Sequence, residues 1–414
     1  MTELETMGRR AKAAARVLAT AGSLKDRALL CAADALEEKT QEILEANKLD
    51  LEAARKNGMS ESMLDRLSLN ENRIKGMADG IRQVAAQIDP VGRVLEGSVR
   101  PNGLKIEKVR VPLGVIGMIY EARPNVTADA AALCLKAGNA VILRGGKEAI
   151  QSNRAIAETL REAVASAGLP KDSIQLVQDT TRASSLEMMG LTSYLDVLIP
   201  RGGAGLIRSV VENSRVPVIE TGVGNCHVFV DESADLETAA DIVFNAKTSR
   251  PSVCNAIETV LVHAAAAEAF LPVMQARLKE KDVEIHGCPR TKEILGGGVI
   301  DATEEDWSTE YLDYKLAVRV VDSFDDAVEH IAKYSSGHSE AIMTKDYQNA
   351  ERFTERVDSA AVYVNASTRF TDGGEFGLGA EIGISTQKLH ARGPMGINEL
   401  TSMKFIIHGD GQIR

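Results

Sequence analysis

The chain has 414 residues, a formal net charge of −11 and a hydrophobic fraction of 44%. This length predicts two or three domains rather than one core. The acidic balance argues against a general affinity for nucleic acid or an anionic membrane, and no apolar run reaches the roughly 18 residues of a membrane-spanning helix.

Cysteine and histidine usage excludes several further classes. The five cysteines include no Cys-x-x-Cys pair, so neither a disulfide framework nor a metal site is expected. A reducing, cytoplasmic location follows, and the charged N-terminal segment lacks the apolar core of a signal peptide. The absence of His-x-x-x-His, His-Glu-x-x-His and Gly-x-Ser-x-Gly motifs disfavours zinc and serine hydrolases.

The first part of the chain is expected to be helical and to end in a β-hairpin. From about residue 3 to 88, Ala and Leu recur at spacings of three and four, which predicts helices. Residues 94–95 and 105–111 then alternate charged with apolar side chains, which predicts an exposed hairpin.

From residue 113 onward, apolar runs alternate with helical stretches. Strands are predicted at 115–120, 140–143, 174–177, 197–199, 227–230, 257–263, 316–321, 339–343, 360–364 and 402–408. Helices are predicted at 127–137, 148–167, 203–213, 235–247, 265–280, 324–334 and 346–356. This alternation predicts an α/β fold with mostly parallel, doubly wound sheets.

Two glycine-containing turns follow predicted strands, where ligands of open α/β sheets bind. The first turn contains Arg144, Gly145, Gly146 and Lys147. Its two cations would suit a phosphate, although an ordinary turn with solvated charges explains them equally well. The later turn contains Gly202, Gly203 and Gly205, where the backbone can approach a pyrophosphate, but such a cluster is a weak signal by itself.

Two polar segments are candidate functional loops. Asn125 follows strand 115–120, and its amide could stabilise an oxyanion, although asparagine beside proline is also a common loop element. Residues 370–383 contain five glycines, which indicates either a functional loop or a flexible connector.

Cys254 is the candidate nucleophile. If Ser249 or Ser252 caps a short helix with Pro251 in its first turn, the thiol lies at the positive end of the helix dipole, which favours the thiolate. A thiolate attacks carbonyl and acyl carbon. The alternatives are a buried structural cysteine and a cysteine protease, which would need a histidine such as His227 or His263.

Together these segments resemble the aldehyde dehydrogenase superfamily. The matching residues are 111–117, 120–127, 138–146, 249–255 and 373–383, which occur in the family's order and cover nearly the whole chain. The resemblance implies a Rossmann-type cofactor domain, an α/β catalytic domain and a small β oligomerisation flap. The implied ranges are 1–98 and 113–223 for the cofactor domain, 224–397 for the catalytic domain, and 99–112 and 398–414 for oligomerisation strands.

The resemblance is strongest to the branch that reduces an acyl phosphate. It implies NADPH-dependent reduction of L-glutamyl 5-phosphate to L-glutamate 5-semialdehyde, the second step of proline biosynthesis, through a thioester on Cys254. Asn125 and the Cys254 N–H would stabilise the oxyanion. Arg123, Arg250, Arg369 and Lys247 are candidate partners of the substrate's anions, although each could equally be a structural ion pair.

Cofactor choice also follows from the resemblance. Arg144 and Lys147 stand where the superfamily has a lysine and an NAD-selective glutamate, so they favour the 2′-phosphate of NADP(H). Glu310 resembles the glutamate that holds the nicotinamide ribose, although the usual Phe-Gly-Pro after it is absent. Glu220 is not assigned as a water-activating base, because Thr221-Gly222-Val223-Gly224 replaces the Leu-Gly-Gly of hydrolytic members.

Three alternatives remain at this point: a hydrolytic aldehyde dehydrogenase, a non-enzymatic binding protein on the same fold, and a bifunctional kinase–reductase. The last is disfavoured because 414 residues leave no space for a kinase domain. A separate glutamate 5-kinase could be a partner, since acyl phosphates are labile in water. The two oligomerisation segments predict a homodimer or a tetramer.

Overall fold

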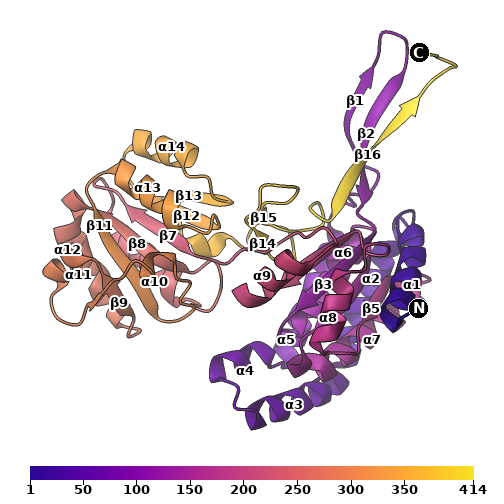
Figure 1. The fold of residues 1–414 in the computed structure, drawn as a ribbon, viewed down its shortest axis with the longest axis horizontal. Helices are drawn as coiled ribbons and strands as arrows, with labels where there is room; N and C mark the ends of the chain where they lie inside the picture. Colours follow the sequence, from indigo (N-terminus) through magenta and orange to yellow (C-terminus); the bar gives the residue numbers. More distant parts are fainter. The chain divides into compact units, whose positions relative to one another are not determined.

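The computed structural model describes residues 1–414, apart from the side chain of residue 62. The chain forms two compact units (Figure 1). Unit 1 comprises Met1–Thr221, Gly377–Gly383 and Met395–Arg414, and unit 2 comprises Gly222–Phe376 and Ile384–Pro394. Each unit is described by itself.

Unit 1 begins with the predicted helices. They are α1 (Glu3–Leu18), α2 (Leu24–Glu38), α3 (Thr40–Lys56), α4 (Glu61–Leu67) and α5 (Glu71–Ala86). The first helix begins with a reciprocal capping box between Thr2 and Glu5, and the Asn70 side chain caps α5. Their apolar faces are rich in alanine and leucine, which lets them pack closely on one another.

A four-stranded parallel sheet forms the centre of unit 1. The strands are β3 (Val115–Tyr120), β4 (Ala140–Gly145), β5 (Ile174–Leu176) and β6 (Val197–Arg201), in the order β5-β4-β3-β6. Between them run α6 (Asn125–Lys136), α7 (Ile150–Ser166) and α8 (Arg182–Met189), and α9 (Ala204–Asn213) follows β6. The strand order reverses between β3 and β6, so their carboxyl ends form a topological switch point.

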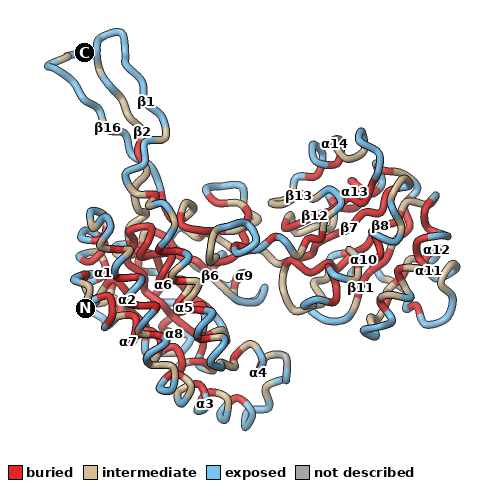
Figure 2. The backbone as a smooth tube through the Cα atoms, turned by 180° about the vertical axis from the view of Figure 1, so that it is seen from behind, coloured by how far each residue is buried: buried red, intermediate tan, exposed pale blue. Residues whose placement is uncertain are grey.

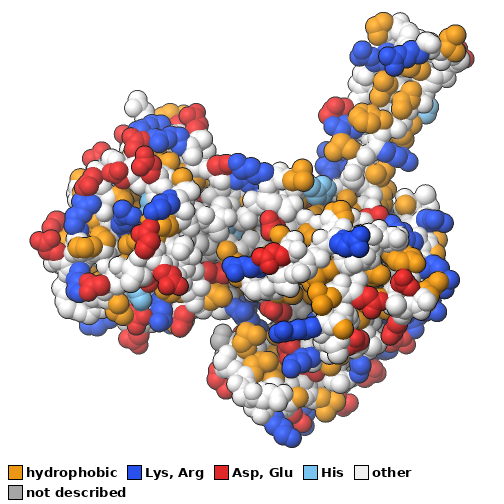
Figure 3. All heavy atoms as spheres, in the orientation of Figure 1, with side chains coloured by type: hydrophobic (Ala, Val, Ile, Leu, Met, Phe, Trp, Pro, Cys, Tyr) orange, Lys and Arg blue, Asp and Glu red, His pale blue; other side chains and the backbone are white. Residues whose placement is uncertain are grey.

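The predicted hairpin is part of a three-stranded antiparallel sheet in unit 1. It pairs β1 (Val94–Val99) with β2 (Lys105–Pro112) and β2 with β16 (Thr401–His408). Most of its residues are exposed (Figure 2). Met403, Phe405 and Ile407, which share one face of β16, are 51%, 61% and 54% exposed, and hydrophobic side chains run along this sheet in Figure 3.

Unit 2 contains a seven-stranded parallel sheet in the order β10-β9-β11-β8-β7-β12-β13. Its strands are β7 (Cys226–Val230), β8 (Ile257–His263), β9 (Glu284–Gly287), β10 (Ile300–Asp301), β11 (Lys315–Val321), β12 (Ser339–Met343) and β13 (Ala361–Val364). Its helices are α10 (Leu236–Thr248), α11 (Ala264–Lys279), α12 (Pro289–Leu295), α13 (Phe324–Tyr334) and α14 (Tyr347–Arg356). A short pair, β14 (Ile384–Ser385) and β15 (Gly393–Pro394), completes the unit.

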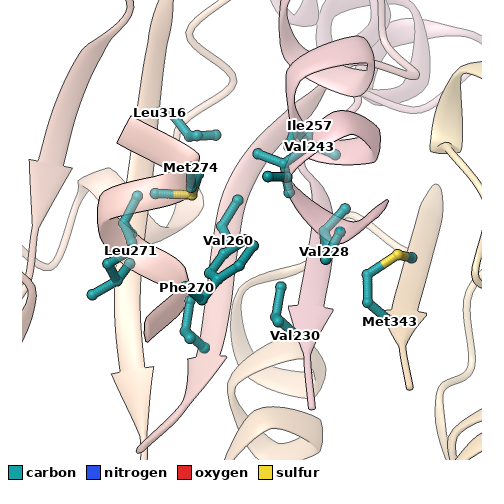
Figure 4. Close-up of a cluster of buried hydrophobic side chains, with 14 of the residues drawn as sticks. Val228, Val230, Val243, Ile257, Val260, Phe270, Leu271, Met274, Leu316 and Met343 are labelled. Carbon is teal, nitrogen blue, oxygen red and sulfur yellow. The ribbon is translucent and has the colours of Figure 1, made fainter. Parts of the chain in front are cut away.

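Both faces of this sheet are buried, and every residue of the central strands β7 and β12 is buried. Val228 and Val260 pack with Phe270 of α11 on one face (Figure 4). Phe229 and Leu261 belong to a second cluster that includes residues of α13 and α14 on the other face. The predicted α/β class with parallel sheets is confirmed, whereas the short elements α8, α12 and β9 were not predicted.

Candidate active site

Cys254 lies at the amino edge of the unit 2 sheet, in the loop that joins α10 to β8. The predicted short helix around it is wrong. Ser249 donates its N–H to the Asn245 carbonyl at the end of α10, and residues 251–256 form turns. The residue before a proline disfavours helical geometry, so Pro251 ends the helix. Cys254 therefore follows the negative end of a helix, and the dipole does not favour its thiolate.

The backbone of Cys254 packs against the segment that leads into β7. A Cβ atom on Gly224 would lie 1.7 Å from the Cys254 carbonyl oxygen, so only glycine fits there. The Cys226 thiol donates to the same oxygen over 3.1 Å. Burial raises the pKa of Cys226 well above its usual value, which keeps it a protonated donor. The register between β7 and β8 shifts after Cys226, so an irregular pairing adjoins this contact.

Asn255 holds the Cys254 loop from a second side, through contacts with residues 368–371. Its side-chain nitrogen donates to the carbonyls of Arg369 and Thr371 at 3.2 and 2.9 Å, and its side-chain oxygen accepts from the Arg369 guanidinium. The Asn255 carbonyl accepts from the Thr368 hydroxyl at 2.7 Å. Arg369 also donates to the Ser249 hydroxyl at 3.0 Å, so it joins both ends of the loop that carries Cys254.

Two arginines carry positive charge at this loop: Arg250 within it and Arg369, which binds it. Burial lowers the pKa of Arg369, the charge of Arg250 acts in the same direction, and Asp372 and the Cys254 thiol oppose them. Arginine remains protonated under such conditions. A guanidinium near a thiol favours its thiolate, so Arg369 acts on Cys254 in the direction that was expected of the helix dipole.

Glu310 lies in the segment before β11 and contacts Gly224, the glycine that packs against Cys254. Its carboxylate accepts the Gly224 N–H at 2.7 Å. Two residues later, the Leu312 N–H donates to Glu258 at 3.2 Å. Glu258 forms an ion pair of 2.5 Å with Lys247, and both side chains are fully buried. Lys247 is therefore a structural ion-pair residue of α10, and Glu258 ties both α10 and the Glu310 segment to β8.

In unit 1, Asn125 is the first residue of α6, immediately beyond β3. Its side chain is exposed and donates to Asp129, one helical turn later, at 2.9 Å. Arg123 is partly buried in the same connection. The Glu121 N–H donates to the Arg201 carbonyl at 3.1 Å, so the carboxyl ends of β3 and β6 lie side by side.

The two cations of the turn after β4, Arg144 and Lys147, differ in exposure. The Arg144 side chain is 9% exposed and donates to the carbonyls of Thr180 and Thr181 at 2.7 and 2.8 Å. Lys147 is exposed. A Cβ on Gly146 would lie 2.3 Å from the Glu148 carboxylate, so an acid adjoins the two cations. Lys147 is thus the accessible cation of this turn.

In the second glycine turn, which follows β6, the backbone binds a carboxylate of the protein itself. The Gly203 N–H donates to Glu121 at 2.9 Å, and a Cβ on Gly202 would lie 2.5 Å from the same carboxylate. Gly205 has open space beside it. A carboxylate at the start of α9 occupies the position where a pyrophosphate was expected, so phosphate binding there requires Glu121 to move.

The candidate residues thus divide between the units. Cys254, Glu310, Arg250 and Arg369 come together in unit 2, and the remaining candidates belong to unit 1. Gly224, Cys226 and Asn255 were not predicted as supports of the Cys254 loop, because their contacts join residues far apart in the sequence. His263 is the last residue of β8, at the opposite end of the strand from Cys254. Over all residues that the structure describes, no group of acids, cysteines and histidines is arranged to hold a metal ion, and no helix is long and apolar enough to cross a membrane.

The comparisons with known proteins show the family of the chain. The family model described as the aldehyde dehydrogenase family matches residues 2–317. The chain belongs to the aldehyde dehydrogenase family, which confirms the resemblance. It is 62% identical to a gamma-glutamyl phosphate reductase of Clostridium novyi, over 98% of this chain and 97% of that protein. A gamma-glutamyl phosphate reductase of Caldanaerobacter subterraneus is 60% identical over the full length of both chains.

Solved structures give the same result. The crystal structure of gamma-glutamyl phosphate reductase from Thermotoga maritima matches with a TM-score of 0.96 and 51% identity, covering both chains fully. An acetylating aldehyde dehydrogenase from Geobacillus thermoglucosidasius matches with a TM-score of 0.73 at 20% identity, covering 100% of this chain and 97% of that one, and shows the fold alone.

Proposed function

We propose that the chain reduces L-glutamyl 5-phosphate with NADPH, giving L-glutamate 5-semialdehyde and phosphate, as the second step of proline biosynthesis. The names of its relatives support the substrate. The observation that carries the chemistry is the fixed backbone of Cys254, held by Gly224, Cys226 and Asn255 in a loop that Arg369 binds.

In the proposed reaction, the Cys254 thiolate forms a bond to the acyl carbon, and phosphate leaves with the electron pair of the broken C–O bond. The Cys254 N–H and the Asn125 amide donate to the oxyanion of each tetrahedral species. Reduction of the thioester gives a thiohemiacetal, whose collapse releases the aldehyde and returns the thiolate. Arg250, Arg369 and Arg123 are the proposed partners of the substrate's carboxylate and phosphate.

NADPH, when bound, supplies the hydride. The exposed Lys147 beside the fixed Arg144 fits a 2′-phosphate, and we propose Gly145, Gly146, Gly202, Gly203 and Gly205 as backbone contacts. Glu310 is the proposed partner of the nicotinamide ribose. Glu310 accepts the Gly224 N–H through one carboxylate oxygen, and a carboxylate can accept a further hydrogen bond from a ribose hydroxyl.

We also propose the division of labour between segments. Residues 1–98 and 113–223 form the cofactor domain and 224–397 the catalytic domain, in a cytoplasmic enzyme. The strands within 99–112 and 398–414 mediate a homodimer or tetramer, supported by the exposed Met403, Phe405 and Ile407. A Phe405→Glu variant should then have a smaller mass in light scattering, and an unchanged mass would contradict this assignment. Contact with a glutamate 5-kinase remains a further proposal.

The test of the function is NADP reduction with glutamate 5-semialdehyde, with and without phosphate. The proposal predicts steady turnover only with phosphate and none for Cys254→Ala. Oxidation that continues without phosphate would instead support a hydrolytic aldehyde dehydrogenase. Near-normal turnover of Cys254→Ala would contradict the thioester.

A further inference from the structure

Asn125 has a neighbour that the proposed reaction does not yet use. Asp129 lies one turn further along α6, and its Oδ2 accepts the Asn125 Nδ2–H at 2.9 Å. Residues four apart share a helix face, so the helix itself sets this pair. Asp129 is only partly exposed, whereas Asn125 is exposed. The carboxylate therefore holds an amide that is open to a ligand.

An asparagine amide can serve an oxyanion in only one of its two orientations. Its nitrogen carries two N–H donors, and its oxygen only accepts. An ionised carboxylate also only accepts, so it bonds the nitrogen and never the oxygen of Asn125. One N–H is used by Asp129, and the second remains for a substrate oxygen. A flipped amide would present its carbonyl oxygen to a developing negative charge.

We propose that Asp129 is a positioning residue for the reaction, whose carboxylate orients the Asn125 amide so that an N–H faces the acyl oxygen. This inference rests on the proposed function, in which Asn125 stabilises the oxyanion. Asp129 itself touches neither substrate nor cofactor and acts through Asn125.

The surroundings of Asp129 make this orientation sensitive to pH. Burial raises the pKa of Asp129 to about 6, although the hydrogen bond from Asn125 lowers it. Two charged side chains from other segments act on it: Arg201 at the end of β6 lowers the pKa, and Glu381 in the 377–383 segment raises it. These two lie 3.9 Å apart. Below pH 6 the protonated acid can donate to the amide oxygen, so the amide is free to turn and turnover falls.

The test is the turnover of Asp129→Asn in the phosphate-dependent assay, alone and combined with Asn125→Ala. We expect kcat to fall about 10- to 100-fold, up to the loss seen when one oxyanion donor is removed. KM for NADP and the rate of Cys254 alkylation by iodoacetamide should stay unchanged, since neither uses Asn125. In the Asn125→Ala background, Asp129→Asn should cost nothing more. The matched control is Asp172→Asn, which removes another carboxylate of unit 1, 3.7 Å from Arg161.

Three results would overturn the inference. One is normal kcat in Asp129→Asn while Asn125→Ala is impaired. Another is an equal loss with and without Asn125, which would mean that the two act independently. The third is a raised KM for the semialdehyde at unchanged kcat, which would make Asp129 a partner of the substrate's ammonium group. Full activity of Cys254→Ala or Asn125→Ala would instead count against the proposed function.

The pH profile supplies a readout even where Asp129→Asn fails to fold. Wild-type kcat should have an acid limb near pH 6, and Asn125→Ala should lack that limb because the amide is gone. A limb that persists unchanged in Asn125→Ala would overturn the proposal.

Discussion

The two units contain the same kind of parallel sheet, but their candidate residues lie at opposite edges. In unit 1 the candidates follow the carboxyl ends of β3, β4 and β6, next to a reversal of strand order. In unit 2, Cys254 and the glycine that supports it precede the amino ends of β8 and β7. The carboxyl-end rule therefore locates the proposed ligand site in the first sheet and would miss the proposed nucleophile in the second.

The difference has a physical consequence. The unit 1 turns offer the exposed Lys147 and glycine backbone, which suit a ligand that arrives and leaves. The unit 2 edge holds its loop through buried contacts to several neighbouring segments. We therefore expect changes in the glycine turns of unit 1 to alter cofactor binding, and changes in the Cys254 loop of unit 2 to alter stability or turnover.

The largest expected effect is on the stability of unit 2. Lys247→Met leaves the fully buried Glu258 without its ion-pair partner, which typically costs about 3–5 kcal/mol. Thermal and urea unfolding should show this loss. Lys345→Met, which removes an exposed lysine bound to Asp235 at 2.8 Å, is the matched control and should change little. A comparable loss in both variants would mean that burial of the pair is unimportant.

The next effect is on the nucleophile itself. In Gly224→Ala the added methyl group collides with the Cys254 carbonyl, so the loop must move. A displacement of this kind costs on the order of 100-fold in kcat/KM. Gly297→Ala, in the same unit with open space at its Cβ, should remain active. Wild-type activity in Gly224→Ala would refute the close packing on which the site rests.

The unit 1 turn should show a smaller effect, confined to binding. Lys147→Ala should raise KM for NADPH about tenfold, which corresponds to about 1.4 kcal/mol, and leave KM for NADH unchanged. Steady-state kinetics with both cofactors measure the difference. Lys171→Ala, an exposed lysine that pairs with Glu158, is the control. An equal rise for both cofactors would assign Lys147 to something other than the 2′-phosphate.

The smallest effect concerns the second thiol. Cys226→Ala removes one hydrogen bond to the Cys254 carbonyl, worth about 1 kcal/mol, so turnover should fall several-fold. Cys226→Ser restores a donor and should recover most of the loss. If serine is as impaired as alanine, the size of the sulfur rather than its hydrogen bond matters.

The same comparison explains how much the sequence predicted. Hydrophobicity located strands such as 257–263 and 339–343 at their observed bounds, because each contains a buried apolar run, at 260–262 and 341–343. The prediction of a short helix at Cys254 was wrong, because α10 ends just before Pro251 and Ser249 caps that end instead of starting a new helix. Gly224 and Cys226 were not predicted because each contacts Cys254 from a segment nearly thirty residues earlier. Residue spacing along the chain does not indicate such a contact.

The central claim is that Cys254 carries an acyl group whose release needs phosphate, and a burst measurement tests it most directly. The enzyme is mixed with glutamate 5-semialdehyde and NADP without phosphate, and NADPH formation is followed by absorbance. The account predicts a rapid burst equal to the concentration of Cys254, then almost no turnover until phosphate is added, and no burst in Cys254→Ala. Steady NADPH formation without phosphate, or a burst that survives loss of the thiol, would contradict it.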